Sequence, residues 1–297
     1  WQRGGGATLL FLPPSLRSGG KMNHIEKCTI VASIVLFIIV SMMSIEATDA
    51  ETTSFTVEYP GDDTNPTYSI VYTINETSAD EDPTVSISEI NVVDEKTRIN
   101  PGKTAHYNGI DYTITGIDDD AFSSEEVKKN VRRVDVPTTV TELSGPIFEN
   151  MTGLEYLSIL GKTTINGQGL ARNCNSLTTI NMSAMVNGTL DSSFEGCKSL
   201  ATFDKPAKVV FGNNAFKDCT SLTTVIASGC TSILSNAFSG CSDLSTVTVA
   251  KCTSITSNAF NGCASLSYVK VAQDCNIATN SFHDCDSLEL VTIGSVN

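Results

Sequence analysis

The sequence has little histidine and little positive charge. Its 297 residues include three His and one Trp, and 19 Lys plus Arg stand against 33 Asp plus Glu, which gives a formal net charge of -14. Nucleic-acid binding needs a basic surface that neutralises phosphates, so this balance argues against nonspecific nucleic-acid binding. His106 and His283 lie far apart, and with so few His we expect neither a His-based metal site nor a catalytic triad.

Motifs of catalysis and metal binding are also missing. The sequence has no P-loop, no G-x-S-x-G elbow, no H-E-x-x-H pair and no C-x-x-C pair. Three acidic runs, at residues 62–63, 80–82 and 118–120, lack the spacing of an EF-hand calcium loop, and we interpret them as solvated surface. We therefore expect no enzyme activity, no cofactor and no bound metal.

Charged residues are absent between Lys27 and Glu46, a stretch that contains the apolar run at residues 30–40. Basic residues before the run and small residues after Glu46 complete the pattern of a signal peptide, which we predict over residues 22–50. Export places the rest of the chain outside the cytoplasm. The expected location is therefore secreted or at the cell surface.

The N-terminal stretch leaves one alternative open. Residues 28–45 reach the lower limit of length for a bilayer span, so an uncleaved signal anchor would attach the protein to a membrane through this segment alone. Residues 1–21 begin with Trp and are rich in Gly, and we interpret them as a non-native leader ahead of a start at Met22.

The sequence is rich in a repeat of 22 or 23 residues. A Leu recurs at this interval: Leu154, Leu177, Leu200, Leu222, Leu244, Leu266 and Leu288. Three residues after each Leu comes a second apolar residue, and in most units a third follows two residues later. Because L-x-x-V-x-V alternates with a period of two, each unit predicts a half-buried strand.

Each unit also carries a Phe that is followed three residues later by a Cys. Five units show this pair: Phe194 and Cys197, Phe216 and Cys219, Phe238 and Cys241, Phe260 and Cys263, Phe282 and Cys285. Cys174 occupies the same slot one unit upstream. A single unit cannot bury its apolar face alone, so equivalent positions of successive units must stack.

The full motif, N-A-F-x-G-C-x-S-L-x-x-V-x-V at residues 258–271, resembles the BspA-type leucine-rich repeat, and the resemblance covers residues 109–297. It implies a β-rich repeat solenoid, a right-handed leucine-rich-repeat superhelix with a parallel sheet on one face and short turns or helical turns on the other. It also implies a microbial surface adhesin or binding protein. We assign the repeats to residues 107–297.

Cysteines form two ladders with the repeat spacing. Six hold the slot after Phe, and Cys230, Cys252 and Cys275 form the second ladder. Because disulfides form outside the cytoplasm, a disulfide framework is the alternative in an exported protein. Stacked equivalent residues, however, lie about 4.8 Å apart with parallel Cα–Cβ vectors, whereas a disulfide needs the two Cβ atoms to point at each other. We therefore interpret both ladders mainly as small buried side chains.

Residues 51–106 lie outside the repeat register but carry strand patterns. Runs at residues 54–59, 68–74 and 85–90 are separated by Asp, Asn and Pro clusters, which predicts a small antiparallel β cap region over the open edge of the first coil. A separate ligand-binding module is the alternative. Residues 107–110, Tyr-Asn-Gly-Ile, predict a type I′ hairpin turn.

The excess of negative charge belongs to the N-terminal part of the mature chain. Residues 48–126 contain 3 basic and 18 acidic residues, whereas residues 127–297 contain 12 and 13. The repeat array is thus nearly neutral. Its sheet face should select partners by shape and hydrogen bonding rather than by charge.

Strand positions two and four residues after each Leu should point outward and form two files on the sheet face, Ser158 and Asn181 included. We predict that this face binds a protein or glycan on a host or neighbouring cell. The predicted binding residues are Arg133, Tyr156, Thr179, Thr202, Asp204, Thr224, Ile226, Thr246, Thr248, Tyr268 and Lys270. Tyr and Ile of this kind anchor interfaces, although Thr and Tyr also suit any exposed strand.

Two further features bear on function. The strand edge at residues 290–293 suggests an alternative function, a structural surface-layer component that associates end to end. Glycosylation sequons begin at Asn75, Asn150, Asn181 and Asn187, and their use depends on the source organism.

Overall fold

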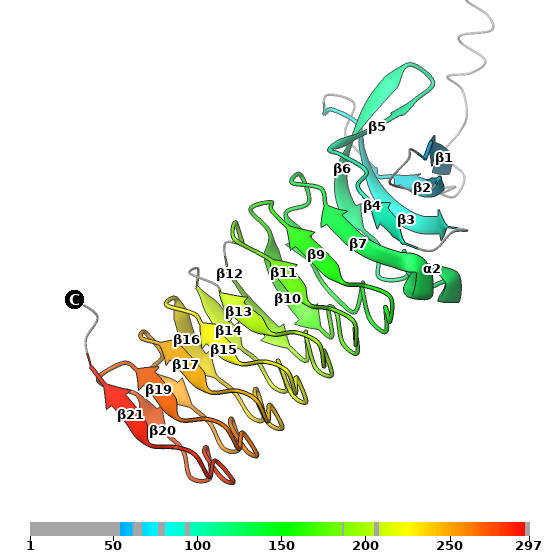
Figure 1. Cartoon of the computed structure of the whole chain (residues 1–297). Coiled ribbons are helices and arrows are strands. Elements are labelled where there is room, and N and C mark those ends of the chain that lie inside the picture. Colours follow the sequence, from blue (N-terminus) through cyan, green and yellow to red (C-terminus); the bar gives the residue numbers. More distant parts are fainter. Residues whose placement is uncertain are drawn as a thin grey trace, which may run out of the picture. The chain divides into compact units, whose positions relative to one another are not determined.

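The regular structure of the described residues consists almost entirely of short β-strands, joined by turns (Figure 1). A computed structural model describes residues 54–61, 67–76, 81–92, 96–185, 187–204 and 208–294. Within these ranges the short α2 (Glu125–Asn130) is the one helix. The predicted leader and signal peptide lie outside the described residues.

The repeats form a solenoid with strands on two sides. Strands of successive coils pair in parallel on each side. The L-x-x-V-x-V segments form the first series: β7 (Val131–Val136), β9 (Tyr156–Ile159), β11 (Thr179–Asn181), β13 (Thr202–Asp204), β15 (Thr224–Ile226), β17 (Thr246–Val249), β19 (Tyr268–Val271) and β21 (Leu290–Ile293). Together with β4 (Thr97–Ile99) they make a four-stranded sheet, β11-β9-β7-β4, and a five-stranded sheet, β13-β15-β17-β19-β21. We call the outward side of these two sheets the front face.

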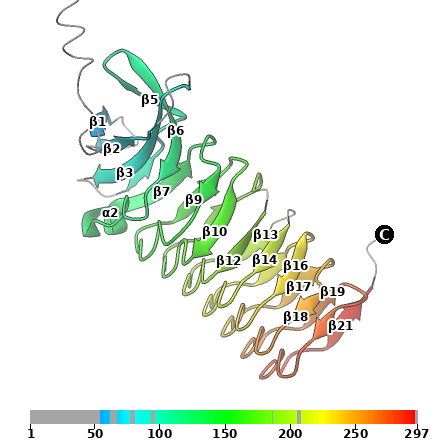
Figure 2. The same ribbon diagram turned by 180° about the vertical axis from the view of Figure 1, so that it is seen from behind.

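In the coils from β7 to β19 a second strand follows and lies behind the first (Figure 2). One seven-stranded parallel sheet, the rear sheet, is made of β8 (Glu142–Leu143), β10 (Thr164–Gln168), β12 (Asn187–Asp191), β14 (Val209–Phe211), β16 (Cys230–Ile233), β18 (Ser254–Ile255) and β20 (Asn276–Ile277). The predicted solenoid is confirmed, and the rear sheet stands where turns were expected. Its strands are two to five residues long, too short for alternation to reveal them in the sequence.

Neighbouring coils pair in a register set by the repeat length. Val247 pairs with Val225 on one side and with Val269 on the other, each 22 residues away. Equivalent residues therefore stack directly, and one short pattern builds a continuous apolar core.

A column of Phe rings runs along this core. The rings of Phe216, Phe238, Phe260 and Phe282 have centroids 5.3, 5.2 and 5.1 Å apart, and their planes lie within 4° of parallel. Each such aromatic pair stabilises the fold by roughly 0.5–1.5 kcal/mol beyond the burial of its area. The recurrent Phe therefore joins adjacent coils to one another.

The turn that carries the Phe uses two left-handed residues in the coils from Phe216 to Phe282. Asn258 (φ 61°) precedes Phe260 by two residues, and Gly262 (φ 75°) follows it by two. Gly adopts this conformation without strain, and Asn is enriched in it among the other residues. The equivalent residues Asn214, Asn236, Asn280, Asp218, Gly240 and Asp284 also have positive φ. This backbone requirement explains why N-A-F-x-G-C recurs.

The nine cysteines of the described residues are free thiols, seven of them buried and two intermediate. The interpretation of the ladders as small buried side chains is thereby confirmed for most of their members. The thiols of Cys219, Cys241 and Cys263 donate hydrogen bonds to Phe carbonyl oxygens of the preceding coil at 3.0–3.1 Å. Cys fits this slot because it combines small apolar volume with a donor.

The N-terminal strands form a separate five-stranded sheet in the order β1-β2-β3-β6-β5. Its members are β1 (Ser54–Tyr59), β2 (Tyr68–Ile74), β3 (Thr84–Val92), β6 (Ile110–Ile117) and β5 (Thr104–Tyr107). The three predicted strands and the hairpin turn are confirmed, since Asn108 (φ 51°) and Gly109 (φ 81°) join β5 to β6. The predicted antiparallel pairing is confirmed for these three strands, since β1 pairs with β2 and β2 with β3 antiparallel, while β6 from beyond residue 106 adds to β3 in parallel.

This sheet is continuous with the first coils of the solenoid. The backbone amide of Ile90 donates to the carbonyl of Ala121 at 3.0 Å, and that of Asp118 donates to Ile87 at 2.8 Å. One apolar cluster extends from Phe55 in β1 into the repeats. β4 leaves the N-terminal segment and pairs in parallel with β7, so that it forms the outermost strand of a front sheet.

Candidate partner-binding face

The predicted binding residues form two aligned files on the front face. The first file holds the register-paired residues Arg133, Tyr156 and Thr179 in one sheet and Thr202, Thr224, Thr246 and Tyr268 in the other. The second file holds Asp204, Ile226, Thr248 and Lys270. Within the described residues no strand pairing joins β11 to β13, so the front face consists of two sheets.

Most side chains of the two files are open to solvent in part. Ile226 is 43% exposed, while Tyr156 and Tyr268 are half-buried. Ser158 lies in the second file, in register with Asp135, as the alternation predicts, but it is 1% exposed and is therefore not available on the surface. It lines a hollow together with Asp135 and Leu160.

Charged side chains converge at the N-terminal end of the front face. The register places Arg98 of β4 beside Arg133 of β7, and Arg133 beside Tyr156 of β9. The guanidinium of Arg133 donates to Asp135 from Nη2 to Oδ1 at 2.8 Å and from Nε to Oδ2 at 3.0 Å. Arg98 Nε donates to the same Oδ2 at 2.8 Å. A single carboxylate therefore orients two guanidinium groups.

The electrostatics of this group follow from its geometry. Burial opposes the ionisation of Asp135, but the hydrogen bonds from Arg133 and Arg98 outweigh it and hold the pKa of Asp135 below its ordinary value. Arg133 also lies over the ring of Tyr156, with its Cζ 3.9 Å from the ring centroid. Cation–π contact of this kind contributes about 0.5–1 kcal/mol at an exposed site. Arg133 is thus held from two sides.

A hollow of about 330 Å³ opens beside this group. Its walls are formed by Arg98, Asn100, Gly102, Lys103, Arg133, Asp135, Val136, Pro137, Thr138, Ser158 and Leu160. We call it the Arg133 hollow. Sequence reasoning found Arg133 and missed Arg98 and Lys103, since β4 has three residues and no repeat register. The one local signal in the sequence was the alternation Thr97–Arg98–Ile99, a charged residue between two β-branched ones. In the structure Thr97 and Ile99 are buried and Arg98 is exposed.

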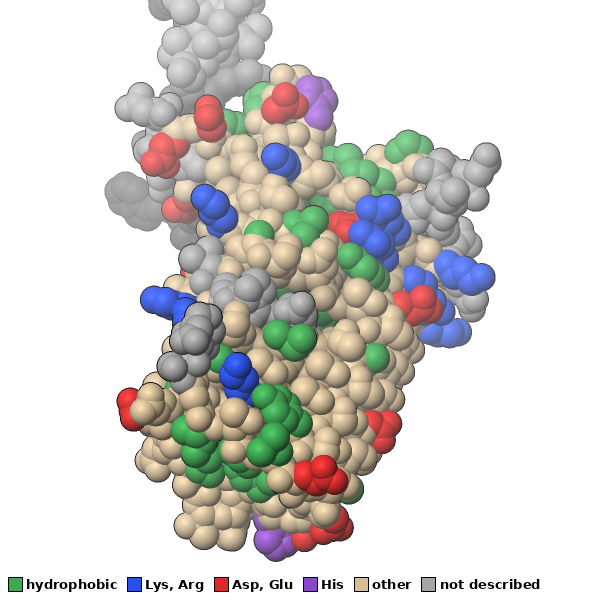
Figure 3. All heavy atoms as spheres, turned by 60° about the vertical axis from the view of Figure 1, so that its left-hand side comes forward, with side chains coloured by type: hydrophobic (Ala, Val, Ile, Leu, Met, Phe, Trp, Pro, Cys, Tyr) green, Lys and Arg blue, Asp and Glu red, His purple; other side chains and the backbone are tan. Residues whose placement is uncertain are grey.

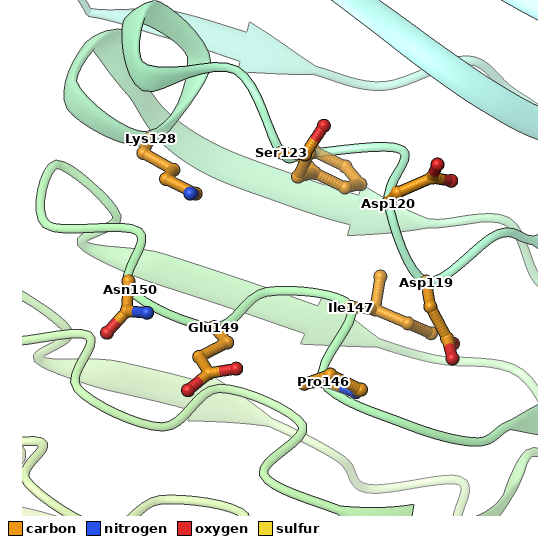
Figure 4. Close-up of a pocket in the computed structure, with 9 residues that line it drawn as sticks. Asp119, Asp120, Ser123, Lys128, Pro146, Ile147, Glu149 and Asn150 are labelled. Atoms are coloured by element: carbon orange, nitrogen blue, oxygen red, sulfur yellow. The ribbon is translucent and has the colours of Figure 1, made fainter.

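A second hollow, of about 190 Å³, lies on the side of the turns (Figure 4). Asp119 and Asp120 from the segment after β6 and Glu149 from the segment before β9 line it, and Lys128 projects from α2. Burial raises the pKa of the neighbouring Asp118, and the charges of Asp120 and Asp119 raise it further. The described part of the chain contains no group of three or more side chains arranged to hold a metal ion.

The rear sheet carries a third hollow, of about 280 Å³, whose lining is almost uncharged. Asn166, Asn187, Thr189 and Thr231 contribute amide and hydroxyl groups, and Lys208 contributes the one charge. Such a surface offers hydrogen bonds without a fixed electrostatic preference.

Apolar side chains gather at the end of the solenoid formed by β21 (Figure 3). Leu290 is 53% exposed and Ile293 is 56% exposed, the largest values among the exposed large apolar residues. Within the described residues β21 pairs with one strand, β19. None of the helices described is long and apolar enough to cross a membrane.

Comparison with known proteins identifies the family of the repeats. The sequence model of the BspA type leucine rich repeat region matches residues 106–223 and 211–297, in six copies. No curated protein matches the chain. The T. pallidum leucine rich repeat protein shares 19% identity over 73% of this chain and 88% of its own, with a TM-score of 0.45. A leucine rich cell surface protein from Faecalibacterium prausnitzii shares 15% identity over 80% of this chain and 94% of its own, with a TM-score of 0.28.

Proposed function

The chain belongs to the BspA-type leucine-rich repeat family, and on that premise we propose that it is an exported repeat protein that binds a macromolecular partner through its front face. The partner is a protein or glycan on the surface of another cell, so the protein acts as an adhesin. The signal-peptide pattern at residues 22–50 supports export, and the repeat array supplies the extended binding surface.

The observation that carries this proposal is the alignment of the two files. Ile226, the exposed apolar side chain near the middle of the face, pairs in register with Thr248 and lies next to the hydroxyl-bearing file that ends in Tyr268. Protein interfaces combine apolar and aromatic anchors with surrounding hydrogen-bonding groups. The front face therefore has the chemistry of a recognition surface with little net charge.

Binding of the purified chain to arrays of extracellular-matrix proteins and glycans tests this function. Replacement of one anchor, Ile226→Asp or Tyr268→Ala, should weaken binding about tenfold, because anchor residues contribute most of an interface's free energy. Thr231→Ala on the rear sheet is the matched control and should bind like the unmodified chain. Undiminished binding by both folded front-face variants would exclude the front face as the binding surface.

A second function, that of a structural surface-layer component, is favoured by the exposed Leu290 and Ile293 on β21. An unpaired strand edge with apolar side chains can pair with another chain. Association should rise with concentration in sizing chromatography and should be lost in Ile293→Lys. Strictly monomeric behaviour at high concentration would remove this alternative.

A further inference from the structure

The Arg133 hollow concentrates positive charge in a part of the chain that has little of it. Residues 48–126 contain 3 basic residues against 18 acidic ones, and two of those three, Arg98 and Lys103, line this hollow. Arg133 joins them from β7. Among the described residues of the lining, one carboxylate, that of Asp135, stands against these three cationic groups. The described lining therefore carries an excess of two positive charges beside a strongly acidic segment.

Two of the three cationic groups, those of Arg98 and Arg133, are held in place before any ligand arrives. Asp135 binds Arg98 and Arg133 at once, and the ring of Tyr156 supports Arg133 from below. The side chain of Asp135 is 16% exposed, whereas those of Arg98 and Arg133 are 48% and 35% exposed. The carboxylate thus lies inward and the guanidinium groups outward. Preorganised guanidinium groups bind planar oxyanions such as carboxylates with little loss of side-chain entropy.

The remaining walls define the rest of the ligand. Leu160 is 46% exposed and adds an apolar wall with Val136 and Pro137. Asn100 and Thr138 add neutral hydrogen-bonding groups. A volume of about 330 Å³ lies at the lower end of the range of small-ligand sites. These walls suit one ring that carries hydroxyl groups, an apolar side and a carboxylate.

We propose that the Arg133 hollow binds the carboxylate of an acidic sugar residue. The hollow opens at the N-terminal end of the front face, where Arg133 and Tyr156 begin the first file. It thereby holds the anionic residue of a glycan whose neutral part lies along the threonine-rich strands. This assignment rests on the function proposed above and names the chemical class of its partner.

Titration of the isotope-labelled full chain with methyl glucuronide, followed by NMR, tests the assignment. Amide shifts should be confined to residues 98–103, 133–138 and 156–160, and they should weaken with added salt. The neutral methyl glucoside should produce none of them. Absence of these shifts with the glucuronide would overturn the proposal.

Two lysine variants give the matched comparison. Lys103→Gln removes one exposed charge from the hollow and should weaken glucuronide binding about tenfold. Lys251→Gln removes an exposed charge from the turn after β17, outside the hollow and both files, and should leave binding unchanged. Equal binding by all three chains would overturn the proposal, because the charge of the hollow would then play no part.

A further titration with a peptide-like ligand distinguishes a sugar carboxylate from the carboxylate of a peptide C-terminus. N-acetyl-leucine and its amide are titrated in the same way, and tighter binding of N-acetyl-leucine than of the glucuronide would assign the hollow to peptide termini instead. A negative glucuronide titration is distinguishable from failure of the proposed adhesin function. Loss of array binding in Ile226→Asp, together with silence of the hollow toward the glucuronide, would keep the front face and reject the sugar site.

Discussion

The thiol of Cys241 donates a hydrogen bond of 3.0 Å to the backbone carbonyl of Phe216 in the preceding coil. The same carbonyl accepts the backbone amide of Cys219 at 3.1 Å. Cys241 and Phe216 are both fully buried, so the thiol links two coils where water has no access. The cysteine ladder is therefore a set of hydrogen bonds between coils as well as a column of small side chains.

Substitution of Cys241 should show both contributions. Cys241→Ala removes the donor and leaves a small cavity, and we expect a loss of about 1–2 kcal/mol in the free energy of unfolding. Cys241→Ser keeps a donor and should cost less. Urea unfolding followed by circular dichroism measures the difference.

Cys275 provides the control within the second ladder. It is half-buried, and its Sγ makes only a long contact of 4.0 Å with the carbonyl oxygen of the adjacent Asn276. Cys275→Ala should therefore change stability by less than about 0.5 kcal/mol. Equal losses at positions 241 and 275 would show that the hydrogen bond contributes nothing.

Buried thiols should also make stability depend on alkaline pH. Burial raises the pKa of Cys174 to about 12 from the ordinary value of 9.0. Below pH 9 the thiol is protonated in both the folded and the unfolded chain. Above pH 9 the unfolded thiol ionises while the folded one keeps its proton, so unfolding releases a proton and stability falls until about pH 12.

The urea midpoint measured at pH 7.5, 9 and 10 checks this expectation. The midpoint should decrease across this series, and Cys174→Ala should decrease less steeply than the unmodified chain. A midpoint that rises with pH, or the same slope in both proteins, would contradict the assignment of the effect to the thiol ladder.

The left-handed turn residues give a test of the repeat motif itself. Asn258 has φ 61° and an exposed side chain, so its identity is set by the backbone and not by packing. Asn258→Val should cost about 1–3 kcal/mol because a β-branched residue is strained in this conformation. Asn258→Gly should be nearly neutral.

Ser257 is the matched control, because it is exposed, adjacent in sequence and absent from the residues with positive φ. Ser257→Val should leave the unfolding midpoint within the usual range of surface substitutions. If Ser257→Val and Asn258→Val destabilise equally, general loss of polarity would explain the cost and backbone strain would not.

The repeat register made most of the fold predictable. The interval between successive Leu residues determines the stacking, so the front strands and the two files followed from counting alone. The rear strands were not predictable, since pairs such as Ser254 and Ile255 are too short to show alternation. Their regularity comes from stacking against neighbouring coils, which is a tertiary effect.

The candidate site was predictable only where the repeat continues through it. Tyr156 and Tyr268 follow from the register, whereas Arg98 reaches the front face through β4, which has no repeat signal. Ser158 shows the opposite limit, because the alternation placed it correctly in the second file but did not reveal that the residue is only 1% exposed. Pattern determines the side of a strand, and local packing determines access to it.

The carboxylate of Asp135 should stabilise the fold at neutral pH through its two guanidinium partners. Its pKa is held below the ordinary value of 3.8, so the charged form favours the folded chain. This contribution is present above pH 3.8 and is lost as the pH falls through the lowered pKa. Asp135→Asn should therefore lower the urea midpoint at pH 7 and reduce the further loss between pH 5 and pH 3.

Asp243 gives the comparison, because it is an exposed Asp in the repeats with no ion pair among those formed by the described residues. Asp243→Asn should leave both the midpoint at pH 7 and its acid dependence unchanged, as expected of an isolated surface charge. The role of Asp135 in orienting Arg98 and Arg133 requires the two variants to differ. If Asp135→Asn unfolds like Asp243→Asn at every pH, the carboxylate does not hold the two guanidinium groups in the solution structure.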